Sequence, residues 1–77
     1  MKIEVLGPGC HNCQLLEEAA KEAVKLAGVD AQIVKVTDYA TIAGYGVIHT
    51  PGLVVDGKVL STGRIPSAGD IASWIDP

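Results

Sequence analysis

The sequence predicts a single α/β domain built on a mixed β-sheet. Three observations lead to this prediction: an amphipathic helical stretch between two short apolar runs, an Asp-Gly pair between two further apolar runs, and a chain of only 77 residues. A strand, a crossover helix and a second strand favour a parallel pair, whereas the Asp-Gly pair favours an antiparallel hairpin. The chain has no internal repeat or linker, so residues 1–77 are expected to form one domain.

The first half of the chain predicts a strand, a long helix, a second strand and a short helix. Residues 2–6 are apolar at most positions and end at a Gly-Pro-Gly sequence, which is typical of a strand. The next stretch repeats apolar side chains at helical spacing as far as Gly28, a plausible helix stop. Residues 31–36 are rich in Ile and Val and predict a second strand, and Asp38 follows as the N-cap of a short helix.

The second half predicts a hairpin and a final helix. Residues 53–55 and 58–60 flank Asp56-Gly57, a pair that suits a tight turn because both turn positions need a positive φ. Ser67 then opens a helix, with Asp70 at the spacing of a capping box. The predicted order is therefore strand, helix, strand, helix, strand, strand, helix.

Composition excludes several classes of function. Hydrophobic residues make up 48% of the chain and the net charge is −3, which argues against disorder and against a surface for nucleic acid. The three aromatic side chains are scattered and cannot form a stacking platform for bases. The first apolar stretch stops at Gly7-Pro8, too early for a signal peptide or a membrane span. We therefore expect a cytoplasmic protein with no nucleic-acid or membrane partner.

The chemistry is predicted to reside in Cys10-His11-Asn12-Cys13, where the first strand gives way to the first helix. A helix N-terminus leaves backbone N–H groups unpaired and carries partial positive charge, so it stabilises a thiolate. Cys10, at the junction, is predicted to be the exposed nucleophile. Cys13, one turn further on, is predicted to attack a mixed disulfide formed on Cys10. This arrangement predicts thiol–disulfide exchange.

Several other interpretations of the pair stay open. A structural disulfide would close a ring so short that it contributes only about 2 kcal/mol, and two unrelated buried thiols would not fall on a loop outside the apolar stripe. A soft-metal or zinc carrier is the main alternative, with His49 as a further ligand, and a non-catalytic interaction module is another. His11 either modulates the thiolate or is simply an exposed polar residue, which is the favoured interpretation.

The chain resembles the thioredoxin/glutaredoxin superfamily, and in particular minimal thioredoxin-like redox-active disulfide proteins. The resemblance covers nearly the whole chain, and its most specific part is a C-x-x-C motif combined with Thr50-Pro51 directly before the hairpin. It implies a thioredoxin-like fold with a four-stranded mixed sheet and helices on both faces. It also implies that the Thr50–Pro51 bond is cis, faces Cys10 and Cys13, and binds substrate.

The same resemblance implies an oxidoreductase with no cofactor and no metal of its own. Its partners would be disulfide-containing proteins, with a thioredoxin-reductase-like flavoprotein or a low-molecular-weight thiol as reductant. His11 and Asn12 differ from the residues usual in glutaredoxins and thioredoxins, so the redox potential does not transfer. Glu4 stands six residues before the first cysteine, where many thioredoxins hold a buried acid that can take the proton from the second cysteine. A solvated or edge-facing glutamate is the favoured interpretation of Glu4.

Overall fold

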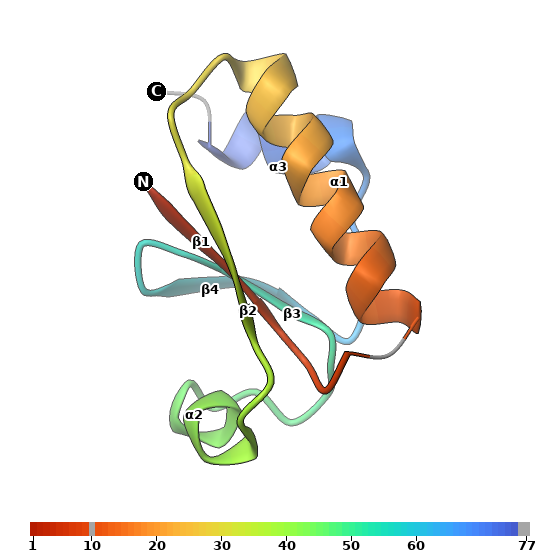
Figure 1. Ribbon diagram of the computed structural model, residues 1–77, viewed down its shortest axis with the longest axis vertical. Helices are drawn as coiled ribbons and strands as arrows, with labels where there is room; N and C mark the ends of the chain where they lie inside the picture. Colours follow the sequence, from red (N-terminus) through yellow and green to blue (C-terminus); the bar gives the residue numbers. More distant parts are fainter. Residues whose placement is uncertain (10, 76–77) are drawn as a thin grey trace.

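The computed structural model describes residues 1–9 and 11–75, which form the elements in the predicted order (Figure 1). The elements are β1 (Lys2–Leu6), α1 (His11–Ala27), β2 (Gln32–Val36), α2 (Tyr39–Gly44), β3 (Gly52–Val55), β4 (Lys58–Thr62) and α3 (Ala68–Ile75). None of the helices in these residues has the length and apolar character that a membrane crossing requires.

The strands form one mixed sheet in the order β2-β1-β3-β4. β1 pairs in parallel with β2, so that Ile3 lies opposite Ile33, and antiparallel with β3, so that Val5 lies opposite Leu53. The hairpin of β3 and β4 completes the sheet. Because β1 lies inside the sheet, its residues after Lys2 are buried. The candidate functional site lies at the end of the sheet where β1 stops.

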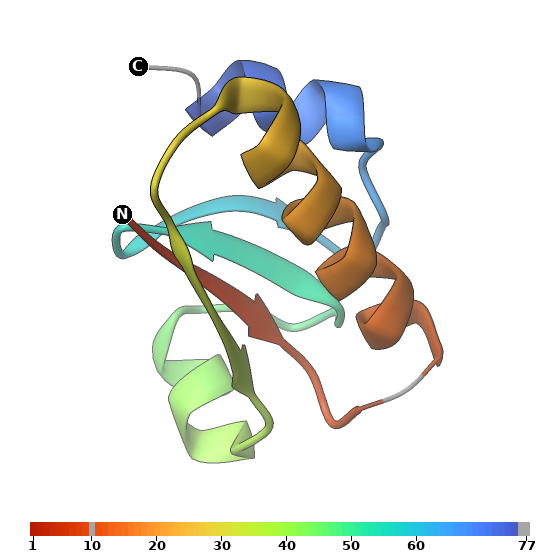
Figure 2. The same ribbon diagram turned by 45° about the horizontal axis from the view of Figure 1, so that its top comes forward.

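Helices cover both faces of this sheet, as the sequence predicted (Figure 2). Side chains alternate along a strand, so neighbouring residues of β1 and β3 point to opposite faces. On one face α1 and α3 pack side by side over the larger apolar cluster, which includes Ile3, Val5, Leu16, Leu53, Ile71 and Ile75. On the other face α2 covers a smaller cluster of Leu6, Ile42, Val47 and Val54.

Local sequence signals set the turns and helix ends. Asp56 and Gly57 adopt φ values of 49° and 83°, as a turn of the predicted type requires. The Asp38 carboxylate accepts hydrogen bonds from the Thr41 amide at 3.0 Å and the Thr41 hydroxyl at 2.7 Å, and these bonds hold the pKa of Asp38 below its ordinary value. β4 extends beyond the predicted residues 58–60, and its last residue, Thr62, lies opposite Gly52.

Candidate active site

Cys13 lies in the first turn of α1 and is buried, with 5% of its surface exposed. The buried residues of this helix are Cys13, Leu16, Ala20 and Ala23, which recur every three or four positions. Cys13 therefore continues the apolar stripe of α1. The prediction that the cysteine pair falls outside this stripe is wrong for Cys13, because the helix is already formed at His11. The sulfur is held against the sheet.

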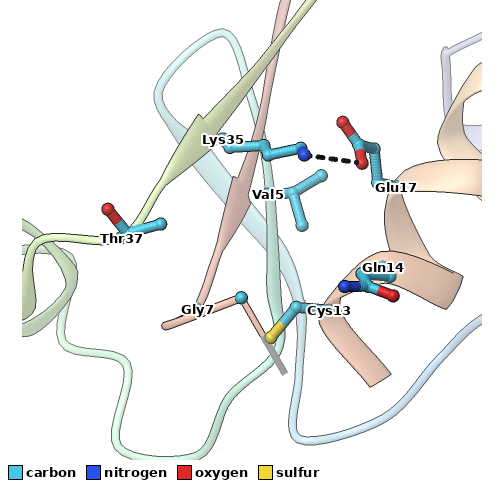
Figure 3. A pocket seen from close by; sticks show the side chains of 8 residues that line it. Val5, Gly7, Cys13, Gln14, Glu17, Lys35 and Thr37 are labelled. Atoms are coloured by element: carbon cyan, nitrogen blue, oxygen red, sulfur yellow. Dashed lines mark ion pairs between the residues drawn. The ribbon is translucent and has the colours of Figure 1, made fainter. Parts of the chain in front are cut away.

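A glycine makes room for this sulfur. Gly7 follows β1 directly, is buried, and donates its amide to the Val36 carbonyl at 2.8 Å. A β-carbon at this position would collide with Cys13 Sγ. In Figure 3 the Cys13 side chain points toward Gly7 from the start of α1. Glycine at residue 7 thus allows Sγ to approach the backbone at the end of β1.

The Thr50–Pro51 segment comes close to the same point from a distant part of the chain. The peptide bond between these residues is cis, and Pro51 is buried. The Pro51 carbonyl accepts a hydrogen bond from the Gly63 amide at 2.9 Å. Thr50 Cβ lies 3.7 Å from the position that a β-carbon on Gly7 would take. Cys13 and Thr50, which the sequence predicted to share a site, therefore both lie next to Gly7.

A pocket of about 320 Å³, part of it open to solvent, lies beside Cys13 (Figure 3). It is formed between the first turns of α1 and the neighbouring ends of β1 and β2. Its lining combines small or apolar groups with polar side chains: Val5, Gly7, Gly9, Cys13, Gln14, Glu17, Lys35 and Thr37.

The charged groups at this pocket are Glu17 and Lys35. The Glu17 carboxylate pairs with Lys35 Nζ at 3.3 Å and, on its own helix, with Lys21 Nζ at 3.9 Å. The Glu17 side chain is 16% exposed, whereas the two lysine side chains are 60% and 62% exposed. Two ammonium groups thus pair with one carboxylate, and of these three side chains Glu17 and Lys35 line the pocket.

Nearly the whole chain also matches a known family: the family model of the thioredoxin domain matches residues 1–76. The chain belongs to the thioredoxin domain family. A thioredoxin from Methanothermobacter thermautotrophicus is 45% identical over 71 residues, which are 92% of this chain and 92% of that protein. A thioredoxin from Methanocaldococcus jannaschii is 44% identical over 69 residues, 90% of this chain and 79% of that protein.

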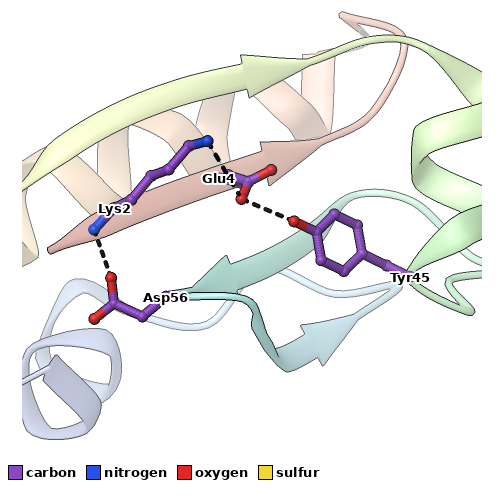
Figure 4. Close-up of polar contacts among 4 residues, drawn as sticks. All are labelled: Lys2, Glu4, Tyr45 and Asp56. Carbon is purple, nitrogen blue, oxygen red and sulfur yellow. Dashed lines mark hydrogen bonds and ion pairs between the residues drawn. The ribbon is translucent and has the colours of Figure 1, made fainter.

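Within this thioredoxin-family fold, Glu4 is buried inside the sheet, with 7% of its surface exposed. Its carboxylate accepts a hydrogen bond from the Tyr45 hydroxyl at 2.9 Å and lies 4.0 Å from Lys2 Nζ (Figure 4). The bond from Tyr45, with some burial, raises the pKa of Tyr45 above 10.0. The prediction of a solvated or edge-facing Glu4 is wrong, because β1 lies between β2 and β3.

The remaining predicted residues are the two histidines and Cys10. His11 is exposed in the first turn of α1, and His49 is exposed with its β-carbon against Gly63. Cys10 lies outside the described residues. Within residues 1–9 and 11–75, no three side chains of the types His, Cys, Asp and Glu form a group that could hold a metal ion. The comparisons give no support to a metal carrier.

Sequence reasoning missed the polar side of the pocket and the partner of Glu4. Lys35 interrupts the apolar second strand, and this interruption is the signal that could have pointed to a charged partner on the covering helix. Glu17 lies four residues after Cys13, so helical spacing places both on one side of α1. Tyr45 gives no such signal, because it is far from Glu4 in the sequence and contacts it only when the chain is folded.

Proposed function

We propose that this chain is a thiol–disulfide oxidoreductase in which Cys10 is the nucleophile and Cys13 resolves the mixed disulfide. The observation that carries the proposal is the placement of Cys13, which is buried in the first turn of α1 with Gly7 making room for its sulfur. Cys10 stands three residues earlier in the sequence. The names of the two thioredoxin relatives support the same class of activity.

The start of α1 supplies the electrostatics for this chemistry. The first N–H groups of a helix are unpaired and carry partial positive charge, which lowers the pKa of a nearby thiol. Cys10 directly precedes His11, where α1 begins, and the first turn contains no acidic side chain to oppose the effect. The proposal therefore assigns the reactive thiolate to Cys10. The modulating roles of His11 and Glu4 stay predictions.

The exchange proceeds in two steps. The Cys10 thiolate attacks one sulfur of the substrate disulfide, forms a mixed disulfide with it, and expels the other substrate sulfur as a thiolate. Cys13 then loses its proton and attacks the Cys10 sulfur, which releases the second substrate thiol and leaves a Cys10–Cys13 disulfide. Two electrons pass to the substrate. A flavoprotein similar to thioredoxin reductase, or a low-molecular-weight thiol, returns two electrons to the pair.

Thr50 and Pro51 form the proposed binding place for protein substrates. Thr50 is half-buried and lies beside Gly7, as Cys13 does. An extended segment of a disulfide-containing protein would pair with the Thr50 backbone and so bring its sulfur to the cysteine pair. The protein is proposed to act in a reducing compartment such as the cytoplasm, where a C-x-x-C pair is kept in the dithiol form.

The test follows thiol release from a model disulfide by the reduced full-length protein. Cys10→Ser removes exchange, because it removes the attacking sulfur. Cys13→Ser retains the first step and accumulates a mixed disulfide on Cys10, seen as a mass increase that dithiothreitol reverses. Both variants are checked for folding by circular dichroism, and the reduced wild type is tested for zinc and copper binding. Exchange that survives in Cys10→Ser, or metal binding in place of exchange, contradicts the proposal.

A further inference from the structure

The pocket beside Cys13 joins two kinds of surface. Gly7 and the Cys13 sulfur lie on one side of it, and the ion pair of Glu17 and Lys35 lies on the other (Figure 3). Gly9, which precedes Cys10 in the chain, lines it as well. A small molecule in this pocket therefore has the redox-active segment at one end and charged groups at the other.

The charged end favours an anion. Glu17 is already paired with Lys35 and Lys21, so the three side chains carry a net charge of +1. Lys35 is 62% exposed, and its ammonium group has three N–H donors. The carboxylate of Glu17 does not use all three of them. Asp38 keeps its negative charge, because the hydrogen bonds from Thr41 hold its pKa low, but it does not line the pocket. The charge of +1 on the three side chains contrasts with the net charge of −3 for the whole chain.

The polar lining also offers neutral groups for a carboxylate. The Gln14 amide and the Thr37 hydroxyl are both hydrogen-bond donors, and they lie on the helix side and the strand side of the pocket. The pocket is small and partly open to solvent, so it suits a molecule of a few carbons rather than a protein segment, for which the Thr50–Pro51 surface is proposed.

We infer that this pocket binds the carboxylate end of a low-molecular-weight disulfide, with Lys35 as the anion contact. The inference rests on the proposed function, since only an exchange-active Cys10–Cys13 pair makes such a ligand a substrate. The dithiol gives two electrons and two protons to the disulfide, which leaves as two mercaptocarboxylate molecules. Lys35 can turn to the ligand at little cost, because its side chain is largely exposed and Glu17 keeps its pairing with Lys21.

The test compares three small disulfides that differ in charge: dithiodipropionate, bis(hydroxyethyl) disulfide and cystamine. The second-order rate constant for oxidation of the reduced protein is measured at low salt for each. Lys35→Met is expected to lower the rate with dithiodipropionate about fivefold, the factor for one ion contact at roughly 4 Å in water. The same variant leaves the rate with the neutral disulfide unchanged and raises the rate with cystamine.

Two further variants sharpen the result. Glu17→Gln removes the one carboxylate between two lysines, so it is expected to raise the rate with dithiodipropionate, opposite in sign to Lys35→Met. Lys58→Met is the matched control, because it removes the same unit charge at the hairpin turn, at the end of the sheet away from Gly52 and Thr62. It should leave all three rates within twofold of wild type.

The outcomes separate the two proposals. If Lys35→Met and Lys58→Met lower the dithiodipropionate rate equally, the effect is one of net charge and the inference is wrong. It is also wrong if Lys35→Met slows all three disulfides alike. If the wild-type dithiol is oxidised by none of the three, the proposed function itself fails.

Discussion

The two faces of β1 place a buried carboxylate and a buried sulfur in different surroundings. On the face covered by α2, the Glu4 carboxylate is enclosed and is met by the Tyr45 hydroxyl at 2.9 Å and by Lys2 at 4.0 Å. On the face covered by α1, the Cys13 sulfur lies against Gly7 and beside a pocket that reaches solvent.

This difference separates a structural polar contact from a candidate reactive one. Burial of a carboxylate is costly unless it is hydrogen-bonded, and Tyr45 supplies that bond. The Cys13 sulfur fits because residue 7 has no side chain, and an open pocket lies beside it. A cysteine that attacks a mixed disulfide on Cys10 needs open space beside its sulfur, whereas a purely structural group does not.

The largest effect is expected from adding a side chain on the Cys13 face. Gly7→Ala places a β-carbon against Cys13 Sγ, and overpacking of this kind destabilises a protein by about 1–3 kcal/mol. Urea denaturation of the reduced protein measures the loss. Because the φ angle of Gly7 is not in the left-handed region, the effect is one of contact rather than of backbone strain.

A control and a second-site variant make that result specific. Gly69→Ala adds the same carbon within α3, where it meets only Ser67 Oγ at 3.8 Å, and it should stabilise the protein by up to about 1 kcal/mol. Removing the sulfur with Cys13→Ala in the Gly7→Ala background should restore part of the lost stability. Additive losses in the double variant would show that Gly7 and Cys13 are not in contact.

A smaller effect is expected on the other face, in the titration of Tyr45. In a Tyr39→Phe background Tyr45 is the remaining tyrosine, so ultraviolet absorbance follows its phenol alone. The pKa of Tyr45 should lie above 10.0, chiefly because its hydroxyl donates to Glu4, and Glu4→Gln should lower it.

The sign of the associated stability change follows from that shift. The folded protein holds the Tyr45 proton more tightly than the unfolded chain, so this contribution is complete below pH 10.0 and is lost as the pH rises through the pKa of the folded state. If Glu4→Gln left the pKa of Tyr45 unchanged, the hydrogen bond from Tyr45 to Glu4 would not be the cause of the shift.

Sequence alone predicted the fold wherever a local signal decides the structure. Asp56-Gly57 determines its turn through backbone conformation, and Ser67 caps α3 by accepting a hydrogen bond from the Asp70 amide at 3.1 Å. Both signals act within a few residues. The periodicity of α1 was equally clear, because its buried face repeats along the helix.

The parts that sequence did not predict depend on pairing between distant segments. Whether Glu4 is enclosed depends on β1 having a strand on each side, and its partner Tyr45 comes from the end of α2. The contact between Lys35 and Glu17 likewise needs β2 to lie beneath α1. A single sequence contains the polar residues but not the register that brings them together.

The most direct test of the central claim is a redox titration of the full-length protein in mixtures of reduced and oxidised glutathione, read by alkylation and intact mass. The account predicts that both cysteines are alkylated in the reduced protein and that both escape alkylation in the oxidised protein. The change between these two states should follow the curve of a two-electron couple. Two cysteines that titrate independently, or a pair that stays alkylated across the whole range, would contradict it.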